Sequence, residues 1–166
     1  SIMKHIEDTP WWICDPEETN YCTYSDTDSI YMHAEPLLRH RHEDFDEMNA
    51  EEKDDALEAI AMEYEGVVTK SYDKLAKDVF RSTEHRLEMK TECVIRSAYF
   101  RATRRYAQWI TKQEGIKKET LDVKGLEFKK ANFPPVLGKF FKNALVDVLK
   151  GATQKEIDDR LKIFKK

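Results

Sequence analysis

The chain has 166 residues, of which 40% are hydrophobic and 36% charged, and its formal net charge is −4. This length is enough for one domain with a core, and no run of about 18 apolar residues is present that could cross a membrane. Three widely spaced cysteines do not suggest a disulfide framework. We therefore expect a globular protein with reduced thiols, located in the cytoplasm.

The charges are unevenly distributed along the chain. Residues 1–83 carry 8 Lys and Arg against 21 Asp and Glu, a formal charge of −13, whereas residues 84–166 carry 20 against 11, a charge of +9. An acidic half beside a basic half is typical of a protein that holds metal ions with one and a polyanion with the other. The simpler interpretation of the acidic half is a solvated surface.

The first twenty residues predict the end of a helix and a loop. Ile2, Met3 and Ile6 have helical spacing, so residues 1–7 are expected to be helical up to the stop at Pro10. Residues 11–20 are expected to form an irregular loop.

Residues 21–33 predict a β-hairpin with two carboxylates at its tip. β-formers lead into and out of the turn, where Asp and Ser are favoured because they bond their own backbone. Two carboxylates this close repel each other unless a cation lies between them. Magnesium binds through one or two carboxylates together with substrate phosphates. Asp26 and Asp28 are therefore candidate metal ligands.

Two helical segments follow the hairpin. A helical or mixed stretch is expected from Pro36 to about Phe45, and residues 51–81 predict a long amphipathic helix. Apolar side chains from Leu57 to Val79 recur at spacings of three and four, opposite a face of Glu, Asp and Lys. Such a helix must lie against another element, most simply the back of a sheet.

The second half of the chain predicts strands and then helices. Alternating apolar and charged residues predict a strand over 87–95, and further strands are expected over about 98–111 and 121–124, with a turn at Gly115. Pro134-Pro135 should open a helix that ends at Gly151. Thr153 and Glu156 form a capping box for a last helix. The chain is therefore predicted to be α+β.

The pair Asp26 and Asp28 has several interpretations. A calcium-binding EF-hand loop is excluded, because Ile30, Tyr31 and Leu37 stand where that loop needs Asp or Asn, Gly and Glu. A plain turn and a metal site that grips a nucleotide sugar both remain open. Residues around the pair are needed to choose among them.

Tyr24-Ser25-Asp26-Thr27-Asp28-Ser29 closely resembles the third palm motif of family B DNA polymerases, in which Gly usually follows the Tyr. The resemblance implies catalytic and metal-binding roles for Asp28, which would hold both magnesium ions, and for Asp26, which would lie beside the primer end. Manganese could replace magnesium.

Three later segments extend this resemblance. Thr103-Arg104-Arg105-Tyr106 is similar to the family's Lys-Lys-x-Tyr motif, and Val123-Lys124-Gly125-Leu126-Glu127 to the segment that leads into the thumb. The resemblance implies DNA contacts from the residues Arg104, Arg105, Tyr106, Lys124, Lys129 and Lys130. Arg104 and Tyr106 are expected to share one strand face. Met89-Lys90-Thr91-Glu92 looks like a strand whose Glu92 supports metal or water.

The order of these segments most resembles the tailed-phage branch of the family. It implies a palm segment over residues 1–115, in which an antiparallel sheet packs on the long helix. Residues 116–166 would form the start of a helical thumb. Nothing in the chain matches the first palm motif or the fingers. The implied partners are a complementing polymerase fragment, primer–template DNA, deoxynucleoside triphosphates and a sliding clamp. The implied location is the host cytoplasm if the protein is viral. The alternatives are a non-catalytic DNA-binding or assembly subunit and a sugar-nucleotide enzyme.

Overall fold

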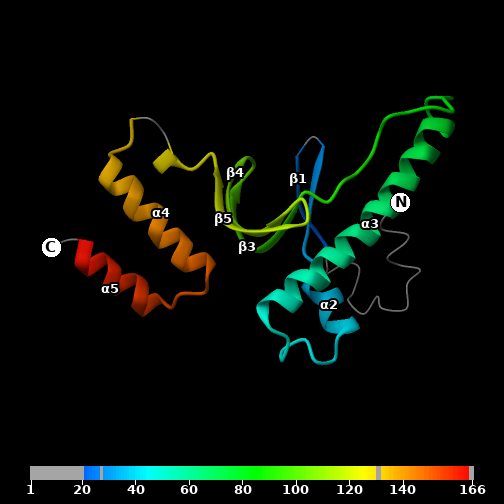
Figure 1. Cartoon of the computed structure of the whole chain (residues 1–166). Helices are drawn as coiled ribbons and strands as arrows, with labels where there is room; N and C mark the ends of the chain where they lie inside the picture. Colours follow the sequence, from blue (N-terminus) through cyan, green and yellow to red (C-terminus); the bar gives the residue numbers. More distant parts are fainter. Residues whose placement is uncertain (1–20, 27, 130–131, 165–166) are drawn as a thin grey trace. The chain divides into compact units, whose positions relative to one another are not determined.

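The computed structural model describes residues 21–26, 28–129 and 132–164 of an α+β chain (Figure 1). The chain divides into two compact units, residues 1–92 and 93–166. The expected helix end at 1–7 and the loop at 11–20 lie outside the described residues. No helix in the described ranges has the length and apolar character needed to cross a membrane.

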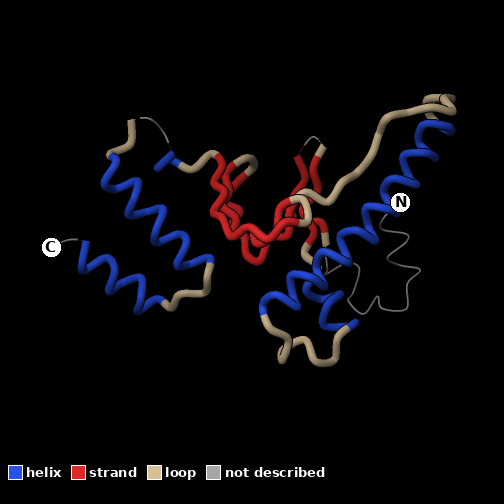
Figure 2. The backbone as a smooth tube through the Cα atoms, viewed as in Figure 1, coloured by secondary structure: helices blue, strands red, loops and turns tan. Residues whose placement is uncertain are grey.

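The predicted hairpin and long helix are both confirmed in the first unit (Figure 2). Strands β1 (Cys22–Asp26) and β2 (Ser29–Met32) pair antiparallel, and helix α2 (Glu35–Arg41) follows them. Helix α3 (Ala50–Asp78) begins at a capping box, in which the Asn49 side chain accepts from the backbone of Glu51 and Glu52. Glu52 completes the box by accepting from the Asn49 backbone N–H at 2.7 Å.

The core of the first unit forms where α2 and α3 meet the base of the hairpin. Its buried members come from α2, from α3 and from residues that flank the helices and strands: Tyr21, Ala34, Leu37, Leu38, Phe45, Ile60 and Tyr64. Ile60 and Tyr64 belong to the predicted apolar stripe, which confirms the helical period. The sheet that contributes to this cluster is the two-stranded one, through Met32 and the adjoining Tyr21.

Truncation of Leu38 to Ala should lower the free energy of unfolding by about 2–5 kcal/mol, because Leu38 is only 1% exposed and its removal leaves a cavity. Urea unfolding followed by circular dichroism at 222 nm measures the change. Met62→Ala is the matched control: Met62 lies on α3 but is 62% exposed, and its truncation should cost about 0.5 kcal/mol or less. Equal effects of the two substitutions would contradict the assigned core.

The strand predicted over residues 87–95 is mostly wrong. Residues 84–92 have no regular secondary structure, and strand β3 begins only at Cys93. The alternation of apolar and charged residues is real, but the backbone N–H groups of Met89 and Thr91 donate to side chains of α3 instead of to a neighbouring strand.

The second unit is built on a three-stranded antiparallel sheet in the order β3-β4-β5. Its strands are β3 (Cys93–Ala102), β4 (Arg105–Gln113) and β5 (Ile116–Lys124). The single strand predicted over 98–111 is therefore wrong, since a turn at Thr103-Arg104 divides it in two. The turn at Gly115 is confirmed, with φ of 76°. The third strand starts earlier than predicted, at Ile116.

Helix α4 (Pro135–Leu149) packs on one face of this sheet, after a short 3₁₀ turn η1 (Glu127–Lys129). Ala107, Trp109 and Val123 form the buried cluster together with Leu149. Helix α5 (Gln154–Phe164) confirms the predicted capping box, because the Thr153 backbone N–H donates to Glu156 at 2.7 Å. The same bond, with that from the Thr153 hydroxyl, lowers the pKa of Glu156.

Candidate functional site

The first candidate site is the tip of the β1–β2 hairpin. Asp26 pairs with Ser29 at the end of the two strands, and Asp28 lies in the turn between them, whereas Thr27 lies outside the described residues. The Asp28 backbone N–H donates to the Asp26 carbonyl at 2.6 Å, and the Ser29 hydroxyl donates to the same carbonyl at 3.1 Å. These bonds place Asp26 and Asp28 at one tip, as the sequence predicts.

The two carboxylates have different surroundings. Asp26 is half-buried, and its Oδ2 accepts from the Tyr24 hydroxyl at 3.4 Å. The Tyr24 ring lies 5.5 Å from the ring of Tyr31, its partner across the strands. Asp28 is exposed. Asp28 is therefore the more accessible carboxylate, and Asp26 the one whose orientation is fixed by a neighbour.

The donor set at the tip suits a hard cation, because both side chains offer carboxylate oxygens and one of them is exposed to solvent. Two carboxylates are fewer than a complete protein site requires. Within residues 21–26, 28–129 and 132–164, no group of three or more His, Cys, Asp or Glu could hold a metal ion. Substrate phosphates or a further carboxylate would have to complete the coordination.

Glu92 lies directly before β3, is exposed, and is not on the strand that the sequence predicted for it. Its role beside the two aspartates stays a prediction.

The second candidate site is the turn between β3 and β4. Ala102 pairs with Arg105, so Thr103 and Arg104 form a two-residue turn in which Arg104 has φ of 58°. Tight hairpin turns need positive φ because the flanking strands twist. Arg104 therefore lies in the turn, and the expectation that it shares a strand face with Tyr106 is wrong.

Strand pairing brings the Arg-Arg-Tyr segment against the Lys-Gly segment at the end of β5. Tyr106 pairs with Lys124, whose Nζ lies 5.7 Å from the centre of the Tyr106 ring. Arg105 lies 4.0 Å from a carboxylate oxygen of Glu127. Two segments about twenty residues apart thus form one basic surface, which we call the basic corner: Arg104, Arg105, Tyr106, Lys124 and Gly125.

Gly125 supports this corner, a role that we did not expect from its sequence position. Its φ is 64°, and a Cβ at this position would overlap the Arg104 carbonyl oxygen and lie 3.1 Å from Cγ of Arg105. The turn therefore rests directly on the Gly125 backbone. The signal in the sequence was an isolated Gly at a strand end, which often marks a close backbone approach.

Tyr106 is more enclosed than a DNA-contacting side chain is expected to be. It is 4% exposed, and its ring lies 5.4 Å from that of Phe100. A direct contact of its hydroxyl with a duplex stays a prediction. Lys129 ends η1, but its side chain lies outside the described part of the structure, as does all of Lys130.

The division into two units nearly coincides with the change in charge. Residues 1–92 carry 10 Lys and Arg against 24 Asp and Glu, a formal charge of −14, and residues 93–166 carry 18 against 8, a charge of +10. The aspartate tip thus belongs to the acidic unit and the basic corner to the basic unit. The predicted boundary between palm and thumb at 115/116 is a functional assignment and stays a prediction.

No protein-family model matches the chain, and no curated protein matches it significantly.

Proposed function

We propose that the chain is the later palm and the base of the thumb of a phage-like family B DNA polymerase. The observation that carries the proposal is the meeting of two predicted DNA-binding segments in the basic corner, where Tyr106 pairs with Lys124 and the Arg104 turn rests on Gly125. Nothing in the spacing of these segments along the chain requires that contact.

The proposed reaction is template-directed nucleotidyl transfer, completed by a partner fragment that supplies the first palm motif and the fingers. Magnesium, when bound, would supply activation of the primer 3′-hydroxyl and stabilisation of the leaving pyrophosphate. Asp28 would provide the shared carboxylate, and Asp26, oriented by Tyr24, would help to position the primer end. Glu92 would support metal or water, and manganese could substitute for magnesium.

The basic corner would hold primer–template DNA by its phosphates. Arg104, Arg105 and Lys124 would bind the backbone with little sequence preference, because phosphate contacts carry no base information. Lys129 and Lys130 would extend these contacts. Deoxynucleoside triphosphates and a sliding clamp complete the proposed set of partners, and the host cytoplasm is the proposed location.

Arg104→Ala and Lys124→Ala are each expected to weaken primer–template binding and to reduce the slope of log K against log salt by about 1. Each substitution removes one cation that would displace a condensed counterion. Fluorescence anisotropy with labelled duplex, from about 50 to 200 mM salt, measures the slope. Lys155→Ala, an exposed change on α5, is the matched control. An unchanged slope in both corner variants would reject the corner as the DNA-binding surface.

A non-catalytic DNA-binding or assembly subunit is the second candidate. It is favoured by one observation: the basic unit has its own buried cluster and is separate from the unit that carries the aspartates. A sugar-nucleotide enzyme would use the aspartate tip without DNA, and the +10 charge of the basic unit argues against it.

A further inference from the structure

Residues 83–91 connect the end of α3 to the start of the second unit, and they lie back along α3 without regular secondary structure. We call these residues the strap. Its hydrogen bonds with α3 involve three helix side chains in reverse order along the chain. The strap therefore runs antiparallel to the helix.

Three contacts attach the strap to α3. His85 Nε2 lies 2.9 Å from Asp73 Oδ1, the Met89 backbone N–H donates to Thr69 Oγ1 at 3.4 Å, and the Thr91 backbone N–H donates to Glu65 Oε2 at 2.7 Å. Glu65, Thr69 and Asp73 are four residues apart, so they lie on one face of the helix. This face provides an acceptor on each of three successive turns.

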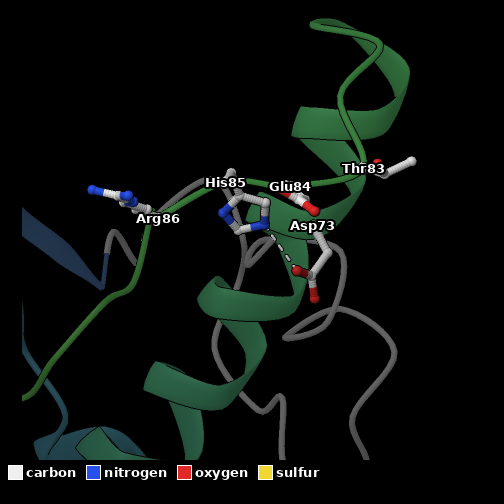
Figure 3. A pocket seen from close by; sticks show the side chains of 5 residues that line it. All are labelled: Asp73, Thr83, Glu84, His85 and Arg86. Carbon is white, nitrogen blue, oxygen red and sulfur yellow. Dashed lines mark hydrogen bonds and ion pairs between the residues drawn. The ribbon is translucent and has the colours of Figure 1, made fainter.

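His85 is the strap residue whose side chain contacts α3. Its side chain is 18% exposed, and its Nδ1 accepts from the Leu87 backbone N–H at 3.1 Å while Nε2 meets Asp73. Figure 3 shows the His85 ring directed at Asp73 and Arg86 directed away from it. An open depression at this point is lined by Asp73, Thr83, Glu84, His85 and Arg86. Nε2 of His85 therefore contacts α3, and Nδ1 accepts a hydrogen bond from within the strap.

The rest of the strap is largely exposed: Glu84, Arg86, Leu87, Glu88 and Lys90 are all exposed. Asp73, the helix partner of His85, also has 70% of its side chain exposed. The hydrogen bond of His85 with Asp73 is exposed, and those of Met89 and Thr91 are part-buried. Three such bonds only roughly offset the conformational entropy lost when nine residues are ordered. Few buried apolar contacts and exposed hydrogen bonds are the properties of segments that open locally.

We propose that the strap is a releasable linker between the two units, with a closed state attached to Glu65, Thr69 and Asp73 and an open state free of α3. In the closed state the chain leaves α3 at Glu65, near the middle of the helix. In the open state the nine residues span up to about 30 Å. Release therefore lengthens the tether that joins the acidic unit to the basic unit. This inference does not depend on the proposed polymerase function.

Amide hydrogen exchange of the full chain, measured by NMR, tests the two states. The amides of Met89 and Thr91 should be protected in the wild type by about 10- to 100-fold relative to the unfolded chain, and less than those of Ile60 and Tyr64 in α3. Glu65→Ala should reduce the protection of Thr91 at least about fivefold, and Thr69→Val that of Met89, with Ile60 and Tyr64 unchanged. Asp78→Ala, an exposed change on α3 outside the three contacts, should alter none of them.

A variant that fails to fold would be recognised by the loss of protection at its α3 amides. The exchange rates of the wild-type chain then test the inference by themselves. Strap amides that exchange as slowly as Ile60 and Tyr64 would show that the strap does not open separately. Strap amides that exchange at the unfolded rate would show that it is never closed. Either result, or unchanged protection of Thr91 in a folded Glu65→Ala variant, overturns the proposal.

Discussion

Asp28→Ala is expected to abolish primer extension when the chain is mixed with a fragment that carries the first palm motif and the fingers. Under the proposed function Asp28 is the carboxylate common to both magnesium ions, and such ions contribute several kcal/mol to the stabilisation of the transition state. We expect the rate to fall by about 10³-fold or more, since each 1.36 kcal/mol changes a rate tenfold. Primer extension on a labelled template, with saturating magnesium, measures the loss.

The hairpin itself should tolerate this substitution, because Asp28 is exposed and its backbone N–H, which donates to Asp26, remains. Asp78→Ala removes the same charge from the acidic unit at an exposed site on α3 and should leave extension unchanged. Extension that survives Asp28→Ala would reject the catalytic assignment.

A manganese titration of the chain separates the proposed polymerase from the non-catalytic alternative. Binding that is lost in Asp28→Ala and kept in Asp78→Ala supports the metal site. DNA binding without any Asp28-dependent metal binding would favour the non-catalytic subunit.

Gly125→Ala is expected to lower the free energy of unfolding of the second unit by about 2–4 kcal/mol. Two effects add. An L-residue at φ of 64° is strained, and the new Cβ would overlap the Arg104 carbonyl oxygen, which belongs to the turn of the basic corner. Urea unfolding followed by the indole NMR signal of Trp109, which is 7% exposed in the core of this unit, measures the loss.

Two other glycines separate these effects. Gly151 has φ of 88°, but a Cβ added there would meet nothing within 4 Å, so Gly151→Ala should cost only the backbone strain, about 1–2 kcal/mol. Gly66 lies inside α3 with open space around it, and Gly66→Ala should stabilise the chain by about 1 kcal/mol. If Gly125→Ala costs no more than Gly151→Ala, the turn does not rest on Gly125.

Local patterns were sufficient where a segment's own residues decide its structure. The Asp- and Ser-rich turn, the apolar stripe of α3 and the capping box of Thr153 with Glu156 each depend on contacts within a few residues. The hairpin that carries Asp26 and Asp28, and the helices after Pro134, were therefore predicted from the sequence.

The same reasoning failed where competing partners lie far along the chain. Residues 87–92 alternate like a strand, but two of their amides, those of Met89 and Thr91, are bonded to Thr69 and Glu65 of α3. The turn at Thr103-Arg104 contains no Gly or Asn to mark it, and it is held by the pairing of β3 with β4 and by the backbone of Gly125.

The sequence by itself determined the α+β class, the aspartate tip and the unequal charge of the two halves. Only the tertiary structure decided that Arg104 leaves the strand, that Tyr106 is enclosed, and that Lys124 and Gly125 complete the basic corner. The reason is that strand pairing joins residues about twenty positions apart. Register between strands is set by the whole sheet and its packing on α4, which no local pattern in the chain encodes.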